Sequence, residues 1–210
     1  MPDADLKHAI DVILRGGTVV FPTETQYALG ALATDKEAIG KIYAIKRRPG
    51  EKLLPVIVGS MAQAQKYFFL TRNEQVLAKK FWPGPLSMVL RTRSKKIAEA
   101  IGSDRLAVRY SADRIAAALA LRAGAPVVST SANTSGKLPC YTVAAVKRQL
   151  STAPAPRCDP DTFLDGGPLK KSLPSTIIEI KNGHFVILRE GKIPTQAIGK
   201  YVPPTLGQVE

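Results

Sequence analysis

Short apolar runs alternate with segments of helical periodicity along most of this chain. The runs are rich in β-branched residues and only three to six residues long, which favours buried strands. They cover residues 18–21, 53–58, 86–90, 106–108 and 126–128. Between them, apolar residues recur at helical spacing, beginning with Leu6, Ile10 and Ile13. The alternation predicts an α/β fold in which helices flank a mixed sheet.

A hairpin is expected near the end of the chain. Residues 175–180 and 185–188 are apolar runs that bracket Lys181-Asn182-Gly183. An Asn-Gly pair between two such runs is a strong signal for a tight turn, and the hairpin would supply antiparallel strands. The 210 residues fit one large domain, or one domain with a short appendage.

Several of the predicted strands end in polar residues. The strand at 126–128 runs into a stretch of hydroxyls and an amide that includes Ser129, Ser131 and Asn133, and the strand at 18–21 runs into Thr23 and Thr25. Two further strands end at arginines, Arg109 and Arg189. Ligands of open α/β sheets bind beyond the carboxyl ends of the strands, so these side chains are candidates for one pocket. An ordinary Ser/Thr/Gly turn at 129–136 is the alternative.

The charge balance indicates an anionic partner. Thirty Lys and Arg against seventeen Asp and Glu give a net charge of +13, which favours either nucleic acid or phosphate-bearing small molecules. Lys46 and Arg48 precede a Pro-Gly break, and Lys52 follows it. These cations suit an anion clamp on a loop, although cations at a helix C-terminus also interact favourably with the helix dipole.

Other common site types are missing from the sequence. It contains no P-loop, no G-x-G-x-x-G and no G-x-S-x-G motif, and its two cysteines and two histidines show no metal-binding spacing. The acidic start, the lack of an apolar run near the roughly eighteen residues that span a bilayer, and the unpatterned cysteines predict a cytoplasmic protein without membrane contact. A pocket of Arg, Lys and Ser/Thr suits phosphoryl or nucleotidyl transfer, which depends on positioning anions and neutralising their charge.

Six short motifs occur in an order that resembles a known family. They are Pro22-Thr23-Glu24-Thr25-x-Tyr27-x-Leu29-Gly30, Lys46-x-Arg48-Pro49, Trp82-Pro83-Gly84-Pro85-Leu86, Ala107-Val108-Arg109, Ser129-Thr130-Ser131-Ala132-Asn133-x-Ser135-Gly136 and Ser175-Thr176-Ile177-Ile178. From about residue 6 to 191 the chain resembles the YrdC-like family, the threonylcarbamoyl-AMP synthases. The resemblance implies a single YrdC-like domain over 1–210, with a twisted mixed sheet around a deep basic cavity and a short tail at 192–210.

The same resemblance implies a reaction and its partners. The family joins L-threonine, bicarbonate and ATP into threonylcarbamoyl-AMP and releases pyrophosphate, a step in the threonylcarbamoyladenosine modification of tRNA. A separate transferase complex takes the product onward. Mg²⁺ is expected to accompany ATP, without a metal site built from protein groups alone.

Site residues are also implied by the resemblance. Lys46 and Arg48 would be catalytic and, with Lys52, would hold the ATP phosphates, while Ser131, Asn133 and Arg189 complete the nucleotide site. Threonine would be held by Thr25, Arg109, the backbone at Ser129, and Ser175. The positions that depart from the family pattern are Gln26, Ala28, Ile57, Arg105 and Pro139.

Two other functions are compatible with the sequence. One is a module that binds double-stranded RNA or tRNA through the same basic cavity without synthesis. The six Phe, six Tyr and one Trp lie mostly in apolar runs, which does not favour a reader of single-stranded RNA. The other is a paralogue that uses a different amine or acid in the same adenylation chemistry.

Overall fold

The computed structural model describes residues 3–47, 54–151 and 158–204. The helices of this part are α1 (Asp3–Leu14), α2 (Lys36–Lys46), α3 (Met61–Tyr67), α4 (Arg72–Phe81), α5 (Lys95–Ile101), α6 (Arg114–Arg122), α7 (Val143–Ser151) and α8 (Thr195–Gly199). The strands are β1 (Val19–Phe21), β2 (Ala28–Gly30), β3 (Val56–Val58), β4 (Leu86–Arg91), β5 (Arg105–Tyr110), β6 (Val127–Val128), β7 (Thr130–Ser131), β8 (Thr162–Phe163), β9 (Thr176–Lys181) and β10 (His184–Arg189). The predicted α/β fold with flanking helices is confirmed.

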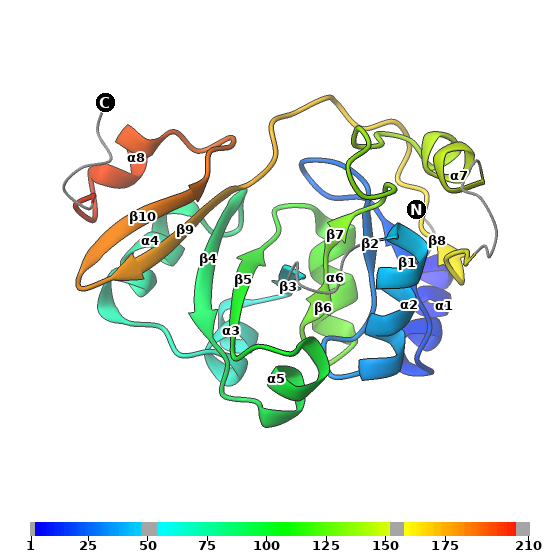
Figure 1. Cartoon of the computed structure of the whole chain (residues 1–210), viewed down its shortest axis with the longest axis horizontal. Helices are drawn as coiled ribbons and strands as arrows, with labels where there is room; N and C mark the ends of the chain where they lie inside the picture. Colours follow the sequence, from blue (N-terminus) through cyan, green and yellow to red (C-terminus); the bar gives the residue numbers. More distant parts are fainter. Residues whose placement is uncertain (1–2, 48–53, 152–157, 205–210) are drawn as a thin grey trace.

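The larger sheet has six strands in the order β10-β9-β4-β5-β3-β6. Its pairings are mixed: β4 is parallel to β9 and antiparallel to β5, and β3 is parallel to β5 and antiparallel to β6. The predicted hairpin is confirmed as β9 and β10, with Asn182 and Gly183 at φ of 51° and 82° in the turn. Figure 1 shows this sheet running from the orange hairpin on the left to β6 near the middle of the molecule.

The remaining strands form a second sheet of four, in the order β7-β2-β1-β8. The sequence predicted one mixed sheet, and the structure instead divides the strands between two mixed sheets. The division falls between β6 and β7, which belong to different sheets although only Ser129 separates them in the chain. The boundary follows from pairing partners that are remote in sequence: β6 pairs with β3, and β7 pairs with β2.

Close backbone packing holds the two sheets together at this point. Val128 donates its N–H to Ala31 O at 2.8 Å, which links β6 to the chain that leaves β2. A Cβ atom on Gly30 would lie 2.1 Å from Val128 O, so any larger residue would force the strands apart. Glycine at this position therefore permits the contact between the sheets.

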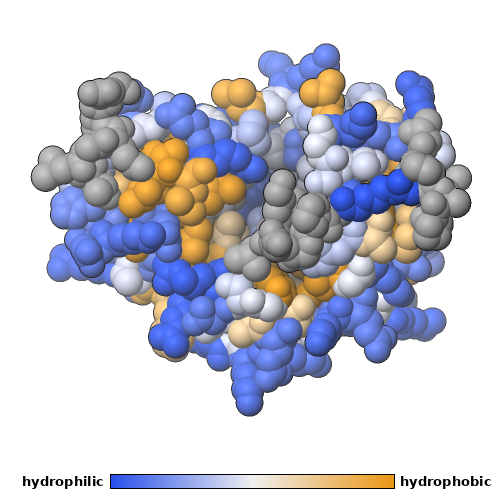
Figure 2. Space-filling view, in the orientation of Figure 1, coloured by the Kyte–Doolittle hydropathy of each residue, from blue (hydrophilic) through white to orange (hydrophobic). Residues whose placement is uncertain are grey.

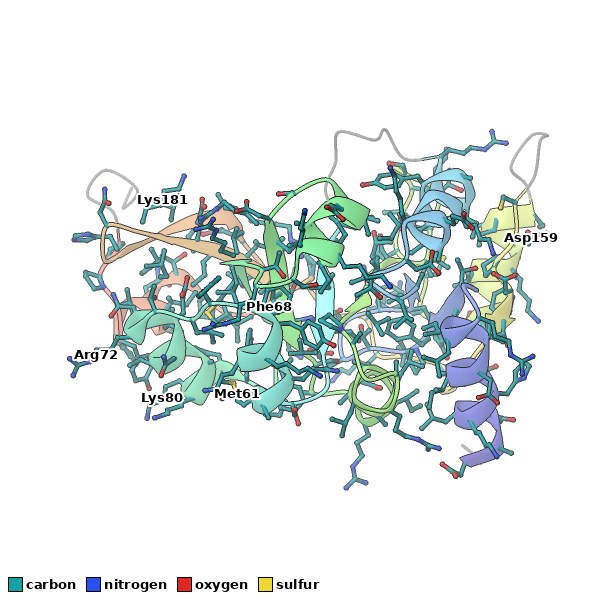
Figure 3. All side chains as sticks on the ribbon, turned by 90° about the horizontal axis from the view of Figure 1, so that it is seen from below. Met61, Phe68, Arg72, Lys80, Asp159 and Lys181 are labelled. Atoms are coloured by element: carbon teal, nitrogen blue, oxygen red, sulfur yellow. The ribbon has the colours of Figure 1, made fainter. Side chains whose placement is uncertain are left out.

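Two groups of buried residues make up the core. The larger group packs α2, α3, α4 and α5 around the six-stranded sheet, with Phe68 fully buried among them. The smaller group joins α1 and α6 to β1. Seen from below in Figure 3, Phe68 points into the interior, whereas Arg72 and Lys80 on α4 point outward. In the described ranges no helix combines the length and the apolar character that crossing a membrane requires.

Tyr27 links β2 to the segment that follows β8. Its buried hydroxyl accepts the Gly166 N–H at 3.0 Å and lies 2.8 Å from Gly167 O and 3.1 Å from Asp165 Oδ1. Burial, together with the neighbouring Asp165 carboxylate, raises the pKa of Tyr27 to about 12. The hydroxyl therefore stays protonated and keeps its role as a donor at neutral pH.

The substitution Tyr27→Phe tests this link. It removes the hydroxyl and leaves the backbone of the 165–167 segment without its partner, so the free energy of unfolding should fall by about 1–2 kcal/mol. Urea denaturation measures the change. Tyr201→Phe is the matched control, because Tyr201 is 43% exposed and keeps its edge-on contact with Phe81 after the substitution. Equal stability of the two variants would contradict the proposed link.

Candidate active site

A cavity of about 580 Å³ lies where the two sheets meet. Both sheets contribute to its wall: β2 and β7 supply Ala28, Thr130 and Ser131, and the larger sheet supplies side chains from β3, β4, β5, β9 and β10. The lining is mixed, with hydroxyl groups, apolar side chains, three arginines and Glu179. The expectation of a cavity is met, but the described lining is not basic throughout.

One end of the cavity is organised by a buried ion pair. Arg109 on β5 pairs through Nη1 with Glu24 Oε1, and the two side chains are only 8% and 14% exposed. Ser111 donates its hydroxyl to Glu24 Oε2 at 2.5 Å. Burial alone would raise the pKa of Glu24, but the Arg109 charge and the bond from Ser111 outweigh it and hold the pKa below its ordinary value. Glu24 is therefore ionised at neutral pH.

The conformation of the loop that carries Glu24 is set by hydrogen bonds within the loop. Thr23 Oγ1 donates to Gln26 O at 2.6 Å and lies 3.0 Å from Thr25 Oγ1, so the Thr23 hydroxyl closes the turn between β1 and β2. Short hydroxyl side chains stabilise such turns by bonding to nearby backbone. The turn places Thr25 in the cavity wall and Glu24 behind Arg109.

A second arginine lies beside the first. Arg189, at the end of β10, donates from Nη2 to Ser175 O at 2.8 Å and to Ser175 Oγ at 2.9 Å. Ser175 Oγ in turn lies 3.0 Å from Ser87 Oγ on β4. Burial, followed by the positive charge of Arg109, lowers the pKa of Arg189. Arg109 and Arg189 thus both add positive charge to the wall of one cavity.

Ser129 is also part of the cavity wall. Its Oγ is buried and has no hydrogen-bond partner within the described segments. The backbone at Ser129 was expected to hold threonine, and its N–H is donated to Pro55 O at 2.8 Å. A buried hydroxyl without a partner costs free energy, so the Ser129 side chain is a local weakness of the folded structure.

Lys46 lies behind the cavity wall. The residue is 1% exposed, and its ammonium donates to Ser131 O, to Asn133 O at 2.8 Å and to Asn133 Oδ1 at 3.2 Å. Its own carbonyl accepts the Ser135 N–H at 2.8 Å. Asn133 Nδ2 donates to Lys137 O. In this arrangement the end of α2 fixes the shape of the loop that follows β7.

The opposite end of the cavity holds another ion pair above an apolar strip. Arg105 Nη2 lies 2.5 Å from Glu179 Oε1, and Lys181 Nζ lies 3.0 Å from Glu179 Oε2. Val89, Ala107 and Ile177 line the strip between this pair and Arg109. At the rim, Leu188 is 52% exposed, and Figure 2 shows apolar surface over the β9–β10 hairpin on this face.

The structure brings together many of the predicted site residues. Those that line the one cavity are Thr25, Arg109, Ser129, Ser131, Ser175 and Arg189. Lys46 and Asn133 are not part of its described lining and instead support the loop behind Ser131. Arg48 and Lys52 lie outside the described residues. Among the residues that the structure does describe, no three His, Cys, Asp or Glu side chains gather in a way that could hold a metal ion.

Sequence reasoning did not assign a site role to Glu24, Ser87, Ser111 or Glu179. Glu24 carried a signal, because an acidic residue stands between two threonines that follow a buried strand. The sequence signal for Ser87 and Glu179 was weaker. Each is a polar residue between two apolar residues of a strand, so its side chain lies on the opposite face of the sheet from those two. Their partners on other strands were not visible in the sequence.

The fold and the cavity define an α/β protein in which arginines and hydroxyl groups line one pocket between two mixed sheets. The family model named for Sua5, YciO and YrdC, and described as telomere recombination, matches residues 11–191. The chain belongs to this Sua5/YciO/YrdC family.

Curated relatives within the family carry the name threonylcarbamoyl-AMP synthase, which is an enzyme. The Neisseria meningitidis protein is 35% identical over 185 residues, covering 86% of this chain and 94% of the relative. The Pyrococcus abyssi protein is 34% identical over 200 residues, covering 94% of this chain and 57% of the relative. A Methanocaldococcus jannaschii protein with the same name, marked putative, is 32% identical over 188 residues. The match covers 90% of this chain and 86% of that relative.

Solved structures agree with the fold. Pyrococcus abyssi Sua5 in complex with L-threonine matches with a TM-score of 0.86 and 33% identity, over 96% of this chain and 58% of the solved chain. Escherichia coli YciO matches with a TM-score of 0.80 over 94% of both chains, at 24% identity. The chain thus spans little more than half of the Pyrococcus proteins and most of the shorter relatives.

The buried ion pair predicts how stability depends on pH. Because the pKa of Glu24 in the folded protein lies below its ordinary value of 4.5, its contribution is complete above that value and is lost as the pH falls through the folded-state pKa. At pH 7, Glu24→Gln should lower the free energy of unfolding by about 3 kcal/mol, since it leaves Arg109 buried without its counter-charge. The difference from wild type should shrink below pH 4.5.

Urea denaturation from pH 7 to pH 3 measures this difference. Asp3→Asn is the matched control, because it neutralises an exposed acid that pairs with Arg122 at the surface. The control should change stability by less than about 1 kcal/mol at any pH. A Glu24→Gln deficit that stays constant down to pH 3 would disprove the linkage.

Proposed function

We propose that this chain synthesises L-threonylcarbamoyl-AMP from L-threonine, bicarbonate and ATP. The observation that carries the proposal is the pair of neighbouring arginines, Arg109 and Arg189, in a hydroxyl-lined cavity. A guanidinium group matches a carboxylate or a phosphate through two parallel hydrogen bonds. The name of the curated relatives and the L-threonine complex of Pyrococcus abyssi Sua5 support threonine as the amino acid.

Threonine would lie at the Arg109 end of the cavity. Its carboxylate would pair with Arg109, and its polar groups would meet the hydroxyls of Thr25 and Ser175 and the backbone at Ser129, residues that line the cavity. The Ser129 N–H is already donated to Pro55 O, so the backbone contact would fall to the Ser129 carbonyl.

ATP would lie next to threonine, with its phosphates toward the loop after β7. Ser131 lines the cavity and Arg189 faces it from the other sheet, while Asn133 holds the loop in shape. We assign charge neutralisation on the phosphates to Lys46 and Arg48, with Lys52 as a further contact. Lys46 would act from behind Ser131, where it already binds that carbonyl. Mg²⁺ would enter with the ATP phosphates, because the described residues build no site for the ion on their own.

In this reaction the protein would position the substrates and would form no covalent bond with them. The threonine amine and bicarbonate combine into a carbamate with loss of water. A carbamate oxygen then displaces pyrophosphate from the α-phosphorus of ATP. Fixed cations and hydroxyl donors lower the barrier by stabilising charge on the transferring and leaving phosphates. The product would pass to a tRNA-modifying transferase complex in the cytoplasm.

Pyrophosphate release tests the function directly. With ATP, L-threonine and bicarbonate together, the protein should release pyrophosphate, and omission of either threonine or bicarbonate should abolish the release. Release that needs an amino acid other than threonine would indicate a paralogue with another substrate. Tight binding of double-stranded RNA or tRNA without release would instead favour the RNA-binding module.

Arg109→Lys tests the placement of threonine. Lysine keeps the positive charge but loses the planar guanidinium, so the apparent affinity for threonine should fall about ten- to a hundredfold. The affinity for ATP should change less than about threefold, because Arg109 is assigned to the carboxylate. Steady-state KM values for both substrates provide the measurement. An equal loss of affinity for ATP would show that Arg109 does not select for threonine.

A further inference from the structure

Glu24 lies in contact with the arginine assigned to the substrate, yet no substrate contact has been assigned to it. Its carboxylate is held from two sides, by Arg109 Nη1 on one oxygen and by the Ser111 hydroxyl on the other. Ser111 is itself fixed at the junction of β5 and α6, where its Oγ accepts the Asp113 N–H at 3.2 Å. Glu24 is therefore a rigid partner of Arg109.

The pairing determines what Arg109 can offer to the cavity. A guanidinium group carries five N–H donors in one plane, so a bond to one nitrogen restricts the orientations that the other donors can take. Glu24 engages Nη1, whereas Arg109 lines the cavity with the rest of its side chain. The remaining donors are thus held in one orientation before any ligand arrives.

Charge balance gives Glu24 a second effect. Arg109 is 7% exposed, and it lines the same cavity as a second cation, Arg189. A buried cation near another positive charge needs an acid beside it, and loss of the bonded carboxylate would weaken the hold on Arg109. Among the described residues, Glu24 is the acid that pairs with Arg109.

We infer that Glu24 is a positioning residue for carboxylate recognition: it acts through Arg109 and sets the orientation in which the guanidinium receives the amino-acid substrate. This inference rests on the proposed function for the identity of the amino acid. It assigns Glu24 no proton transfer and no contact with the reacting atoms. Among the two substrates, its effect falls on threonine, since the ATP contacts lie on other residues.

The expected result is a split between the two substrates. Glu24→Gln should raise the KM and the calorimetric Kd for threonine roughly tenfold or more. A displacement of a binding group by about 1 Å is enough to lose that much interaction with a ligand. KM for ATP should change by less than about threefold, and kcat at saturating threonine should recover most of its value. Glu24→Asp, which keeps the charge on a shorter side chain, should recover part of the threonine affinity.

A double-mutant cycle shows whether Glu24 acts through Arg109. If it does, Glu24→Gln should weaken threonine binding much less in an Arg109→Lys background than in wild type, because the guanidinium that it orients is already gone. Asp3→Asn is the matched control, since it neutralises an acid in a surface pair with Arg122 and should leave both KM values unchanged. Circular dichroism of each variant confirms that it is folded. Ser111→Ala removes the second anchor of Glu24, together with the acceptor for the Asp113 N–H, and leaves the ion pair with Arg109 in place. It should shift the threonine affinity in the same direction by a smaller factor.

The outcomes separate this inference from the proposed function. Additive effects of the two substitutions, or an equal loss of affinity for ATP and threonine, would overturn the positioning role. A wild-type protein that binds threonine but never releases pyrophosphate would overturn the proposed function alone, since the calorimetric cycle still tests Glu24. Non-additive loss that is confined to threonine supports the inference.

Discussion

The cavity depends on the close contact between the two sheets. Only one residue separates β6 from β7, and the chain can change sheets there because Gly30 leaves room for the backbone of Val128. The two sheets then diverge from this contact, and the space between them is the cavity. The residues nearest to the contact, Ser129 and Ser131, are therefore also residues of the site. The contact that packs the two sheets together therefore also sets the position of these cavity residues.

Burial of cations shapes the rest of the site. A charged group that leaves water must find hydrogen-bond acceptors or a counter-charge, or the protein loses stability. Arg109 meets Glu24, and Lys46 meets carbonyls of the loop after β7. Arg189 lies at the exposed end of β10 and still bonds the carbonyl and hydroxyl of Ser175. Each cation thereby fixes the position of a loop or strand end. The positive charge that makes the site suitable for anions also holds its walls in place.

Much of this arrangement could be predicted from the sequence, where the signal is local. The β9–β10 turn and the polar residues after buried strands follow from neighbours in the chain. The motif resemblance correctly indicated the family. The division into two sheets was missed because β6 and β7 choose partners that are far away in sequence. The burial of Lys46 and the pairing of Glu24 were missed for the same reason, since a charged residue gives no sign of where its counter-charge will lie.

Ser129 has a consequence for the stability of the fold. Within the described chain its hydroxyl is dehydrated and without a partner, so the folded protein carries the unfavourable free energy of removing water from that oxygen. The backbone of the same residue is held independently, because its N–H donates to Pro55 O at 2.8 Å. Unlike the buried charges around it, this oxygen therefore contributes nothing favourable to folding, and the position would tolerate alanine as far as stability is concerned.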